Sequence, residues 1–539
     1  MASVCFSKNE LESLLGKEIK KGEIESILPS IGLPVEGVEG DVIYLDVTPN
    51  RPDLLSIEGI ARALSTFMGG KPKHYSAKDS GIKLHIDDSV LPVRPFIVAA
   101  VVKNVKMDEK KIESLMQLQE KIHETYGRKR RKISIGVHNL DAVTPPFFYK
   151  AVEPGSYSFI PLDMEKKLTL SKILELHPKG VEYGGIIREC KKYPLLVDSK
   201  EQALSFPPII NGELTRVDED TKNIFIDVTG TDANAIMDAL KIVSLALVDR
   251  GGEIFTVEII GKKKLETPDL SERAVMLPAD KINKMLGMNF REAQLMKLLA
   301  KMGYTVSGSK VKIPCYRIDV MDWVDLAEDA AIAYGYNNFA PSLPNFFSIG
   351  QEKHSEMLEG KIRELMVGLN FLEIICPNLT NENECFGKML SAEKPHVKIK
   401  NPKVEEYTMM RHWLAPSLLR VISESKHAEL PIRIFETGDA TSLEVGNARE
   451  ARSLACALYD PRATFSEIKS VAEALAREMG WEIEIHPHEH PSFIKGRAAE
   501  IIHKKKKVGV FGEIHPQVLN NFQLEHPVAL LELDLTSFL

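Results

Sequence analysis

Residues 41–67, DVIYLDVTPNRPDLLSIEGIARALSTF, join a short strand-like run, a polar corner with two prolines and an amphipathic helix. Each proline fixes φ and removes an N–H donor, so the segment between them is predicted to form a non-helical turn. Asp53 is then well placed as the N-cap of the helix. Apolar residues recur in the helix at i, i+3, i+4 and i+7, which predicts one buried stripe and a polar face that carries Glu58 and Arg62. A simple strand-to-helix corner would account for this geometry.

The chain of 539 residues is too long for one hydrophobic core, and about 150 residues per domain suggests three or four domains. Its start has no basic region followed by an apolar run, and no apolar stretch is long enough to cross a bilayer. We therefore expect a cytoplasmic protein that does not contact membranes. The net charge of −7 argues against a chain that wraps nucleic acid over its whole surface.

Two basic clusters stand out against this acidic background. The denser one is 128–132, RKRRK, which leads directly into the apolar run ISIGVHNL, and the second is KKKK at 504–507. A solvated loop or hairpin tip is the simplest interpretation of either cluster, and we favour it for the second.

Changes of pattern along the chain predict four domains. Residues 1–85 form a small α+β unit with two further amphipathic helices. Residues 86–265 carry many short β-like runs broken by Pro and Gly, together with two helices, and predict a mixed α/β domain. Residues 266–343 are mainly helical around a short strand, and residues 344–539 alternate long helices with strands. No internal repeat is apparent.

Several motifs resemble one enzyme family along nearly the whole chain. Besides the block at 41–67, they are IGVHNLDAVTPPFFYKAV, HPKGVEYG, YPLLVDSKEQALSFPPIINGELTRV and DWVDLAEDAAIAYGYNNF. They resemble the archaeal and eukaryotic β subunits of phenylalanyl-tRNA synthetase. The resemblance implies an N-terminal α+β domain, a mixed-sheet B3/B4 editing domain, a small α+β B5 domain, and a C-terminal module with the antiparallel sheet and helices of a class II synthetase.

The C-terminal module is expected to be catalytically silent. Its run LPIRIFETGDATSLE resembles motif 2 of class II synthetases, but Ser442 stands where the motif has an arginine, and no GxGxxR element follows near the end. Without fixed guanidinium groups, nothing offsets the charge that develops on the α-phosphate of ATP. The resemblance implies an α2β2 heterotetramer in which the α subunit binds ATP and phenylalanine and which acts on the tRNA for phenylalanine.

Editing is the chemistry expected of this chain itself. A mainly apolar pocket for phenylalanine rejects tyrosine only about a hundredfold, so a second, hydrolytic site follows logically. The resemblance assigns this editing site to Leu195, Ser205, Arg216, Asp227 and Thr229, with Asn211 and Gly212 on the adjoining loop.

Asp227 and Thr229 lie two residues apart in a predicted strand, so they face the same side. Together they are expected to bind polar substrate groups and a water, while Arg216 contacts a tRNA phosphate or the substrate carbonyl. The alternative is that the Asp and Thr merely cap a turn. His138 and His177 are further polar candidates, although a lone histidine among apolar neighbours is usually structural.

A cluster of carboxylates in the B5 region suggests a metal ion. Asp325, Glu328 and Asp329 are spaced i, i+3, i+4 on one helix face, and Asp319 lies just upstream. Carboxylates this close repel one another unless a cation bridges them, and a hard ion such as Mg²⁺ prefers oxygen ligands. The four positions match the magnesium-binding set of the family. An exposed acidic helix face is the competing interpretation.

Three functions are compatible with these observations. The first is the β subunit of phenylalanine–tRNA ligase, which hydrolyses mischarged tyrosyl-tRNA. The second is a purely structural partner whose B3/B4 domain no longer hydrolyses anything. The third is a free-standing nucleic-acid-binding protein that uses the B5 helices, and the net acidity of the chain disfavours it.

Overall fold

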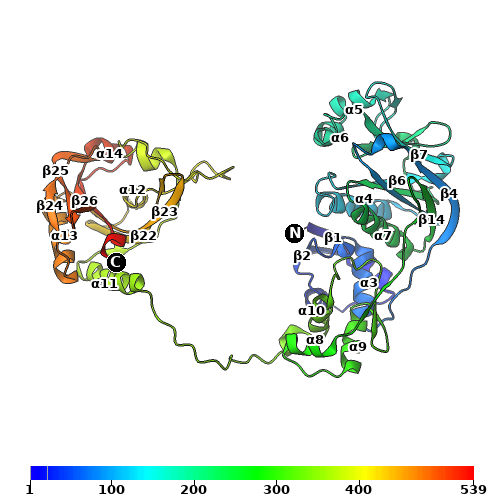
Figure 1. Cartoon of the computed structure of the whole chain (residues 1–539), viewed down its shortest axis with the longest axis horizontal. Helices are drawn as coiled ribbons and strands as arrows, with labels where there is room; N and C mark the ends of the chain where they lie inside the picture. The colour runs from blue at the N-terminus through cyan, green and yellow to red at the C-terminus, as the bar shows by residue number, and fades with distance from the viewer. Residues whose placement is uncertain (1, 21, 426) are drawn as a thin grey trace. The chain divides into compact units, whose positions relative to one another are not determined.

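A computed structural model describes residues 2–20, 22–425 and 427–539, and these form two compact units, Met1–Leu343 and Pro344–Leu539 (Figure 1). Each unit contains its own hydrophobic clusters. Within the described ranges, no helix combines the length and the apolar character that crossing a membrane requires.

The first unit begins with a three-stranded antiparallel sheet of order β1-β3-β2. Its elements are β1 (Ala2–Ser7), β2 (Val35–Glu39), β3 (Val42–Val47), α1 (Lys8–Leu15), α2 (Ile24–Ser30) and α3 (Ile57–Phe67). The strand and helix predicted in residues 41–67, which we call the signature block, are therefore confirmed as β3 and α3. The apolar stripe of α3 is buried in the main core of the unit, as its periodicity predicted.

Two predictions about α3 are wrong. Its N-cap is Ser56, whose hydroxyl accepts the Gly59 N–H at 3.2 Å, whereas Asp53 lies in a preceding 3-10 turn and binds Arg51. Glu58 and Arg62, expected on a polar face, are both buried. The hydrophobic pattern identifies the apolar stripe, but it cannot distinguish a solvent-facing charge from one that meets an opposite charge inside the protein.

The centre of the first unit is a ten-stranded sheet of order β12-β11-β10-β7-β4-β14-β5-β13-β6, with β15 paired to β14. Strand β4 runs parallel to both β14 and β7, and the other pairs are antiparallel, which confirms the predicted mixed sheet. The strands are β4 (Lys78–Ile86), β5 (Phe96–Lys103), β6 (Ile133–Asn139), β7 (Phe147–Val152), β10 (Tyr193–Val197), β11 (Ala203–Phe206), β12 (Ile210–Asn211), β13 (Ile224–Gly230), β14 (Glu253–Ile260) and β15 (Lys264–Thr267).

Helices α4 (Glu109–Glu124) and α7 (Ala233–Asp249) bury apolar residues against β5, β6 and β13, in the same cluster as α3. A smaller cluster lies around α5 (Leu170–Leu176) and α6 (Pro178–Tyr183), next to the hairpin of β8 (Ser158–Phe159) and β9 (Leu168–Thr169). The unit ends with the sheet β16-β18-β17 and three helices. These are β16 (Arg273–Met276), β17 (Thr305–Ser307), β18 (Lys310–Ile313), α8 (Ala279–Leu286), α9 (Glu292–Lys301) and α10 (Trp323–Tyr334).

The second unit is a seven-stranded sheet of order β19-β22-β23-β27-β26-β25-β24, antiparallel except for the pair β19 and β22, with a helix pair on each face. This confirms the predicted antiparallel sheet with helices. Helices α11 and α13 share one cluster, and α12 and α14 share another. The elements are β19 (Leu372–Glu373), β20 (Leu379–Thr380), β21 (Met409–Met410), β22 (Ile432–Glu444), β23 (Asn447–Tyr459), β24 (Glu484–Pro487), β25 (Phe493–His503), β26 (Lys506–Ile514), β27 (Val528–Asp534), α11 (His354–Gly368), α12 (Ala415–Glu424), α13 (Phe465–Met479) and α14 (Pro516–Asn521).

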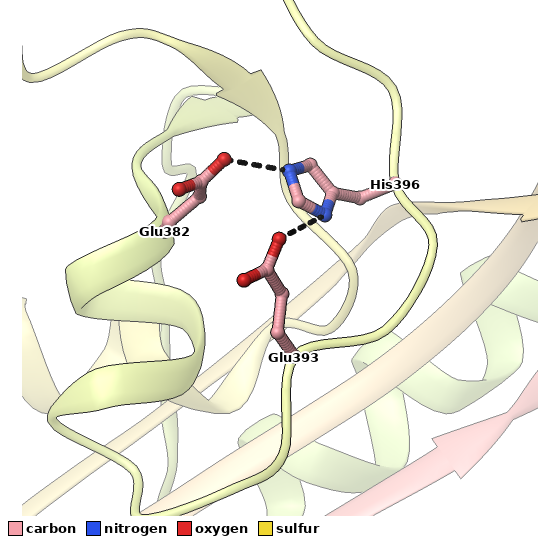
Figure 2. Close-up of side chains that lie close together, drawn as sticks. All are labelled: Glu382, Glu393 and His396. Atoms are coloured by element: carbon pink, nitrogen blue, oxygen red, sulfur yellow. Dashed lines mark hydrogen bonds and ion pairs between the residues drawn. The ribbon is translucent and has the colours of Figure 1, made fainter.

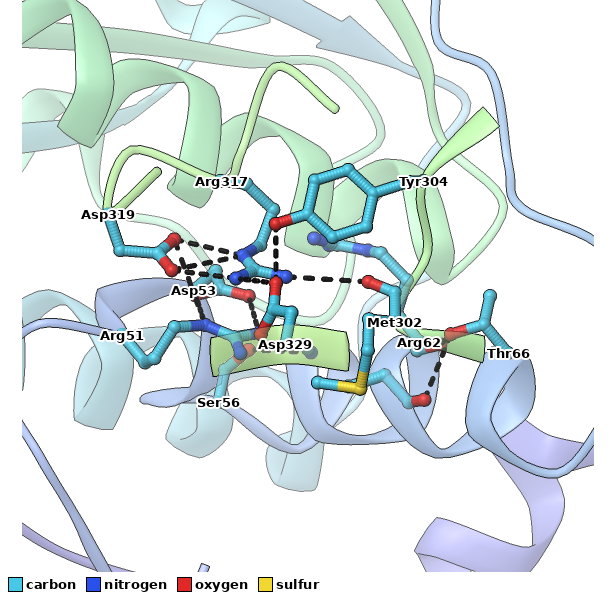
Figure 3. Close-up of polar contacts among 12 residues, drawn as sticks. Arg51, Asp53, Ser56, Arg62, Thr66, Met302, Tyr304, Arg317, Asp319 and Asp329 are labelled. Atoms are coloured by element: carbon cyan, nitrogen blue, oxygen red, sulfur yellow. Dashed lines mark hydrogen bonds and ion pairs between the residues drawn. The ribbon is translucent and has the colours of Figure 1, made fainter. Parts of the chain in front are cut away.

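A buried ionic network joins the corner of the signature block to the last helix of the first unit (Figure 3). Arg317 lies at its centre and binds Asp319 at 2.7 Å and Asp329 at 2.6 Å. Arg51 lies 3.9 Å from Asp319, and the Tyr304 hydroxyl donates to Asp329. Burial opposes the charge of Arg317, but the two carboxylates and Tyr304 outweigh it and raise the pKa of the guanidinium.

Arg317→Met should strongly destabilise the first unit, because it leaves buried carboxylates without their cation, which costs about 3–5 kcal/mol. We expect a lower midpoint in urea-induced unfolding of the full chain. Lys297→Met on the exposed face of α9 is the control and should change the midpoint little. Equal midpoints for the two variants would show that the network contributes no net stability.

Candidate editing site

A cavity of about 280 Å³ opens in the large mixed sheet between β6, β11, β12 and β13 and beside α4. Five of the polar or loop residues expected at the editing site line it: Ser205, Asn211, Gly212, Arg216 and Asp227. In the strand order β12 and β11 lie at one end of the sheet and β13 and β6 at the other. The two ends meet at the cavity, where the Asn211 side-chain amide on β12 donates to Val137 O on β6 at 3.2 Å. The volume of the cavity is close to that of a pocket for one small ligand.

Asp227 on β13 is the buried carboxylate of the cavity lining, only 1% exposed, beside the more exposed Glu120 and Asp163. Asp227 Oδ1 lies 2.7 Å from His138 Nε2, and His138 Nδ1 lies 2.8 Å from the Thr215 hydroxyl. Gly136 is the cross-strand partner of Asp227, and a Cβ at that position would lie 2.3 Å from Asp227 Oδ1. The imidazole thus fixes the carboxylate, and a glycine on the neighbouring strand leaves it the space.

Ser205 on β11 carries an unpaired hydroxyl in the lining of the cavity, and Arg130 Nε in the same lining is likewise unpaired among the described residues. Ser205 itself is 3% exposed. Burying a hydroxyl without a partner costs about 1–3 kcal/mol. A ligand that brings a hydroxyl or another polar group to this wall would satisfy it.

Arg216 lies at the rim of the cavity and is partly exposed. Glu213 binds it at 2.7 Å and Asp163 at 2.6 Å. The hydrogen bonds that the guanidinium donates to Glu213 and Asp163 raise its pKa above the usual value. The side chain is therefore a fixed cation at the entrance, with part of its surface open to solvent.

Leu195 and Thr229 lie outside the cavity lining. Leu195 is buried in the apolar cluster around β10 and β11. Thr229 does share the Asp227 side of β13, as alternation predicted, but its hydroxyl accepts the Arg94 Nε–H at 2.9 Å. In this geometry Thr229 anchors a buried arginine, and Leu195 packs the core beside the site.

The sequence alone did not assign Arg94 or Thr215, and it left His138 among the doubtful candidates. Arg94 is 1% exposed and forms no ion pair with any described residue. Burial lowers the pKa of its guanidinium to about 10, while Tyr149 and Asp227 oppose the shift. Only the alternation of β6, which places the His138 side chain beside Asp227, offered a sequence signal for any of the three.

The four acidic residues proposed as magnesium ligands are divided by the fold. Asp319 and Asp329 bind Arg317, so their charges are already balanced. Asp325 accepts the backbone N–H groups of Met321 and Asp322, and with Glu328 it lines a hollow of about 430 Å³ beside α10. Only Asp325 and Glu328 therefore offer oxygens toward an open space.

Among the described residues, one group of three possible metal ligands lies within 4.8 Å: Glu382, Glu393 and His396. Figure 2 shows that the two glutamates approach opposite nitrogens of the imidazole, Nε2 at 3.1 Å and Nδ1 at 3.9 Å. Lys398 also binds Glu382 at 2.5 Å. The buried imidazole lies between the carboxylates, and its Nδ1 is 2.8 Å from Lys394 O, so both ring nitrogens already have partners within the protein.

The second unit has an internal ion pair behind the strand that resembles motif 2. Arg411 binds Glu436 at 2.7 Å, and both side chains are buried. A Cβ on Gly438 would lie 2.3 Å from an Arg411 nitrogen, so this glycine makes room for the guanidinium. Ser442 faces Arg449 across the β22–β23 ladder, and Arg449 pairs with Glu444 on the surface. The arginines here are engaged by the protein's own carboxylates.

Comparisons with known proteins cover all of these regions. Three families match: the B3/4 domain at residues 94–246, the tRNA synthetase B5 domain at 275–336, and the phenylalanyl tRNA synthetase beta chain CLM domain at 341–535. The cavity and its polar network lie within the first of these ranges.

Whole-chain relatives agree. The phenylalanine–tRNA ligase beta subunit of Archaeoglobus fulgidus is 42% identical over 100% of this chain and 99% of its own. That of Methanocaldococcus jannaschii is 39% identical over 99% and 100%. The crystal structure of an N-terminal fragment of the phenylalanyl-tRNA synthetase beta subunit from Pyrococcus horikoshii is 39% identical, with a TM-score of 0.60, and covers 62% of this chain and 99% of that one. The chain thus belongs to the family of phenylalanine–tRNA ligase β subunits.

Proposed function

We propose that this chain works with an α subunit that binds ATP and phenylalanine, and that its own cavity hydrolyses tyrosine esterified to the tRNA for phenylalanine. The observation that carries the editing proposal is the buried, unpaired hydroxyl of Ser205, which faces the same cavity as Asp227. A cavity that binds only apolar groups would leave the Ser205 hydroxyl unpaired. A purely structural subunit would gain nothing from a buried serine and aspartate in one cavity.

Recognition follows from the hydrogen bonds that a phenol completes. Tyrosine brings one hydroxyl more than phenylalanine, and this hydroxyl is the partner that the polar wall of the cavity lacks. Phenylalanine would leave those groups buried and unpaired, so this site should strongly prefer tyrosine. The apolar pocket that activates phenylalanine has the opposite preference. Correctly charged tRNA is thereby spared.

Hydrolysis requires a water directed at the ester carbonyl. In our proposal Asp227 accepts a hydrogen bond from that water, while His138 holds the carboxylate in place as a positioning residue. The water oxygen bonds to the carbonyl carbon, the ester C–O bond breaks, and the ribose oxygen of the terminal adenosine leaves as a hydroxyl. Arg216 at the rim is placed to contact the carbonyl or a phosphate of the incoming tRNA.

The second unit is the proposed site of assembly with the α subunit. Its sheet ends at β19, an edge strand that pairs on its outer side with no strand of the described residues, and Leu372 there is 68% exposed. Ile375, just beyond the strand, is 90% exposed, and Val367 at the end of α11 is also exposed. Exposed apolar residues at a sheet edge are typical of an interface. A class II-like module without its arginines is most simply explained in the same way, within the α2β2 heterotetramer.

A magnesium ion is the proposed ligand of Asp325 and Glu328. Both carboxylates face an open hollow, and Mg²⁺ commonly binds one or two carboxylates while it keeps several waters. Asp319 and Asp329 fit this role poorly, because they neutralise Arg317. Bound there, the ion would relieve the repulsion between two carboxylates one helical turn apart.

Asp227→Ala should lower the rate of tyrosyl-tRNA deacylation by the assembled enzyme about 100-fold, the scale expected for losing a group that directs proton transfer. Phenylalanine-dependent pyrophosphate exchange, which depends on the α subunit, should stay unchanged. Asp141→Ala, an exposed aspartate that binds Asn223, is the control. Wild-type deacylation by the Asp227 variant would place editing elsewhere, and an inactive wild type would leave the chain as a scaffold.

Leu372→Asp combined with Ile375→Asp should prevent assembly with the α subunit, because two charges would be buried in an apolar contact. Size-exclusion chromatography with light scattering on the coexpressed chains should show a heterotetramer for the wild type and separate subunits for the variant. Val445→Asp, on the fully exposed turn between β22 and β23, introduces a charge outside the edge and should assemble normally. A heterotetramer in all three cases contradicts the proposed interface.

Asp325→Asn combined with Glu328→Gln should abolish the part of thermal stabilisation that depends on Mg²⁺, because ligand binding to the native state alone raises its stability. The readout is the shift of the melting temperature of the full chain on adding MgCl₂. Glu292→Gln removes an exposed charge on the neighbouring helix α9 and should keep the shift. If the double variant keeps it too, this helix face is only solvated.

A further inference from the structure

A second, larger hollow lies beside the editing cavity, and its wall is strongly basic. It has a volume of about 1020 Å³. We call it the basic cleft; it is lined by Arg128, Lys129, Arg131, Lys132, Glu182, Tyr183, Gly185, Ile186, Thr231 and Asp232. Four of these residues come from the cluster RKRRK, which the editing proposal does not use.

The backbone of this cluster is unusual. Three consecutive non-glycine residues, Arg128, Lys129 and Arg130, adopt positive φ values of 51°, 53° and 63°. Such conformations cost roughly 1–2 kcal/mol per residue and persist where surrounding structure imposes them. Here the turn is fastened to the end of α4, because the Gly127 N–H donates to Ile122 O at 2.7 Å and the Arg130 N–H to His123 O at 3.2 Å.

The left-handed turn sends its side chains to opposite sides. Arg130 is buried, lines the editing cavity, and donates to Ile209 O at 2.8 Å and to Glu120 at 2.5 Å. Its guanidinium also lies over the Tyr183 ring, 4.5 Å from the centroid. Because Tyr183 lines the basic cleft and Arg130 lines the cavity, the linings of the two hollows adjoin at this contact.

The cations on the cleft side are left without neutralising partners. Arg128, Lys129 and Arg131 are exposed and form no ion pair with any described residue, whereas Lys132 pairs with Asp232 at 3.2 Å. Beneath them, the buried Arg94 donates to Arg131 O at 3.3 Å, which ties the turn to β13 and adds another positive charge. In a chain of net charge −7, this is a concentrated positive site.

We propose that the basic cleft binds the phosphodiester backbone of the single-stranded 3′ end of an RNA, and so leads the terminal ester into the editing cavity. The inference rests on the proposed editing function. Unpaired cations in a concave surface attract phosphates, and a groove that follows the backbone is how proteins hold single strands without reading sequence. A rigid turn keeps the charges in place, so little side-chain order is lost on binding.

The test uses the full chain assembled with its α subunit and the variant Arg128→Gln/Lys129→Gln/Arg131→Gln. The matched control is Lys504→Gln/Lys505→Gln/Lys506→Gln, which removes three charges at a hairpin turn that also has positive φ at its first two residues. Two substrates are compared: tyrosyl-tRNA, and 2′(3′)-O-tyrosyl-adenosine, which carries the same ester without phosphates.

We expect the cleft variant to lose at least tenfold in kcat/KM on tyrosyl-tRNA while it hydrolyses the phosphate-free ester like the wild type. The control should match the wild type on both substrates. Equal kcat/KM on tyrosyl-tRNA for cleft variant and wild type overturns the inference and leaves the editing proposal intact. A parallel loss on both substrates also overturns it, because the turn would then act only by shaping the cavity.

A binding measurement separates this inference from a failure of editing itself. Fluorescence anisotropy with a short single-stranded RNA ending in CCA gives the salt dependence of affinity. The affinity of every protein for the RNA should fall as the salt rises from about 50 to about 200 mM. Because the cleft variant makes three phosphate contacts fewer, its fall should be roughly 20-fold smaller than that of the wild type and the control. Equal salt dependence in all three proteins refutes the cleft, whether or not the wild type hydrolyses the ester.

Discussion

Buried charge on and around helix α3 holds the first unit together. On one side Arg62 binds Asp249 at 2.7 Å, and Glu58 binds Arg250, so α3 is tied to the end of α7 and thus to the large sheet. On the other side the corner that precedes α3 approaches the network of Arg317 (Figure 3). Pairs this deeply buried add little stability over an apolar contact, but the loss of either partner is costly. Through these pairs, the positions of the large sheet and of the Arg317 network both depend on helix α3.

Paired charged groups also surround the cavity that we propose as the editing site. Around it, Asp227 is fixed by His138, Arg130 by Glu120, and Arg216 by Glu213, so most polar groups already have partners. The Ser205 hydroxyl and Arg130 Nε have no hydrogen-bond partner among the described residues, and both residues line the cavity. A site with an unpaired polar group among rigid neighbours favours ligands that supply the missing hydrogen bond.

The second unit also has charged groups in its interior. Arg411 and Glu436 form a buried ion pair there, although Arg411 Nη1 and Glu436 Oε2 have no hydrogen-bond partner among the described residues. Glu532 accepts the backbone N–H groups of Leu414 and Ala415 at 2.9 Å, and burial nevertheless raises the pKa of its carboxyl to about 7. Ser442 stands where motif 2 of class II synthetases has an arginine, so the module lacks the guanidinium that would offset charge on an ATP phosphate. What the module offers instead is an apolar sheet edge, which suits association better than catalysis.

Periodicity and turn residues in the sequence predicted the order of the elements, because these patterns lie within short windows. The resemblance to the synthetase family implied the mixed and antiparallel sheets and the candidates Ser205, Arg216 and Asp227. Only the tertiary structure decided that Glu58 and Arg62 are buried, that Thr229 holds Arg94, and that Arg317 divides the acidic cluster. Each of these outcomes depends on a partner far away in the chain, from 12 residues for Arg317 and Asp329 to 192 for Glu58 and Arg250. Hydrophobic patterning reports which residues avoid water, whereas the pairing of charges is settled only when distant segments meet.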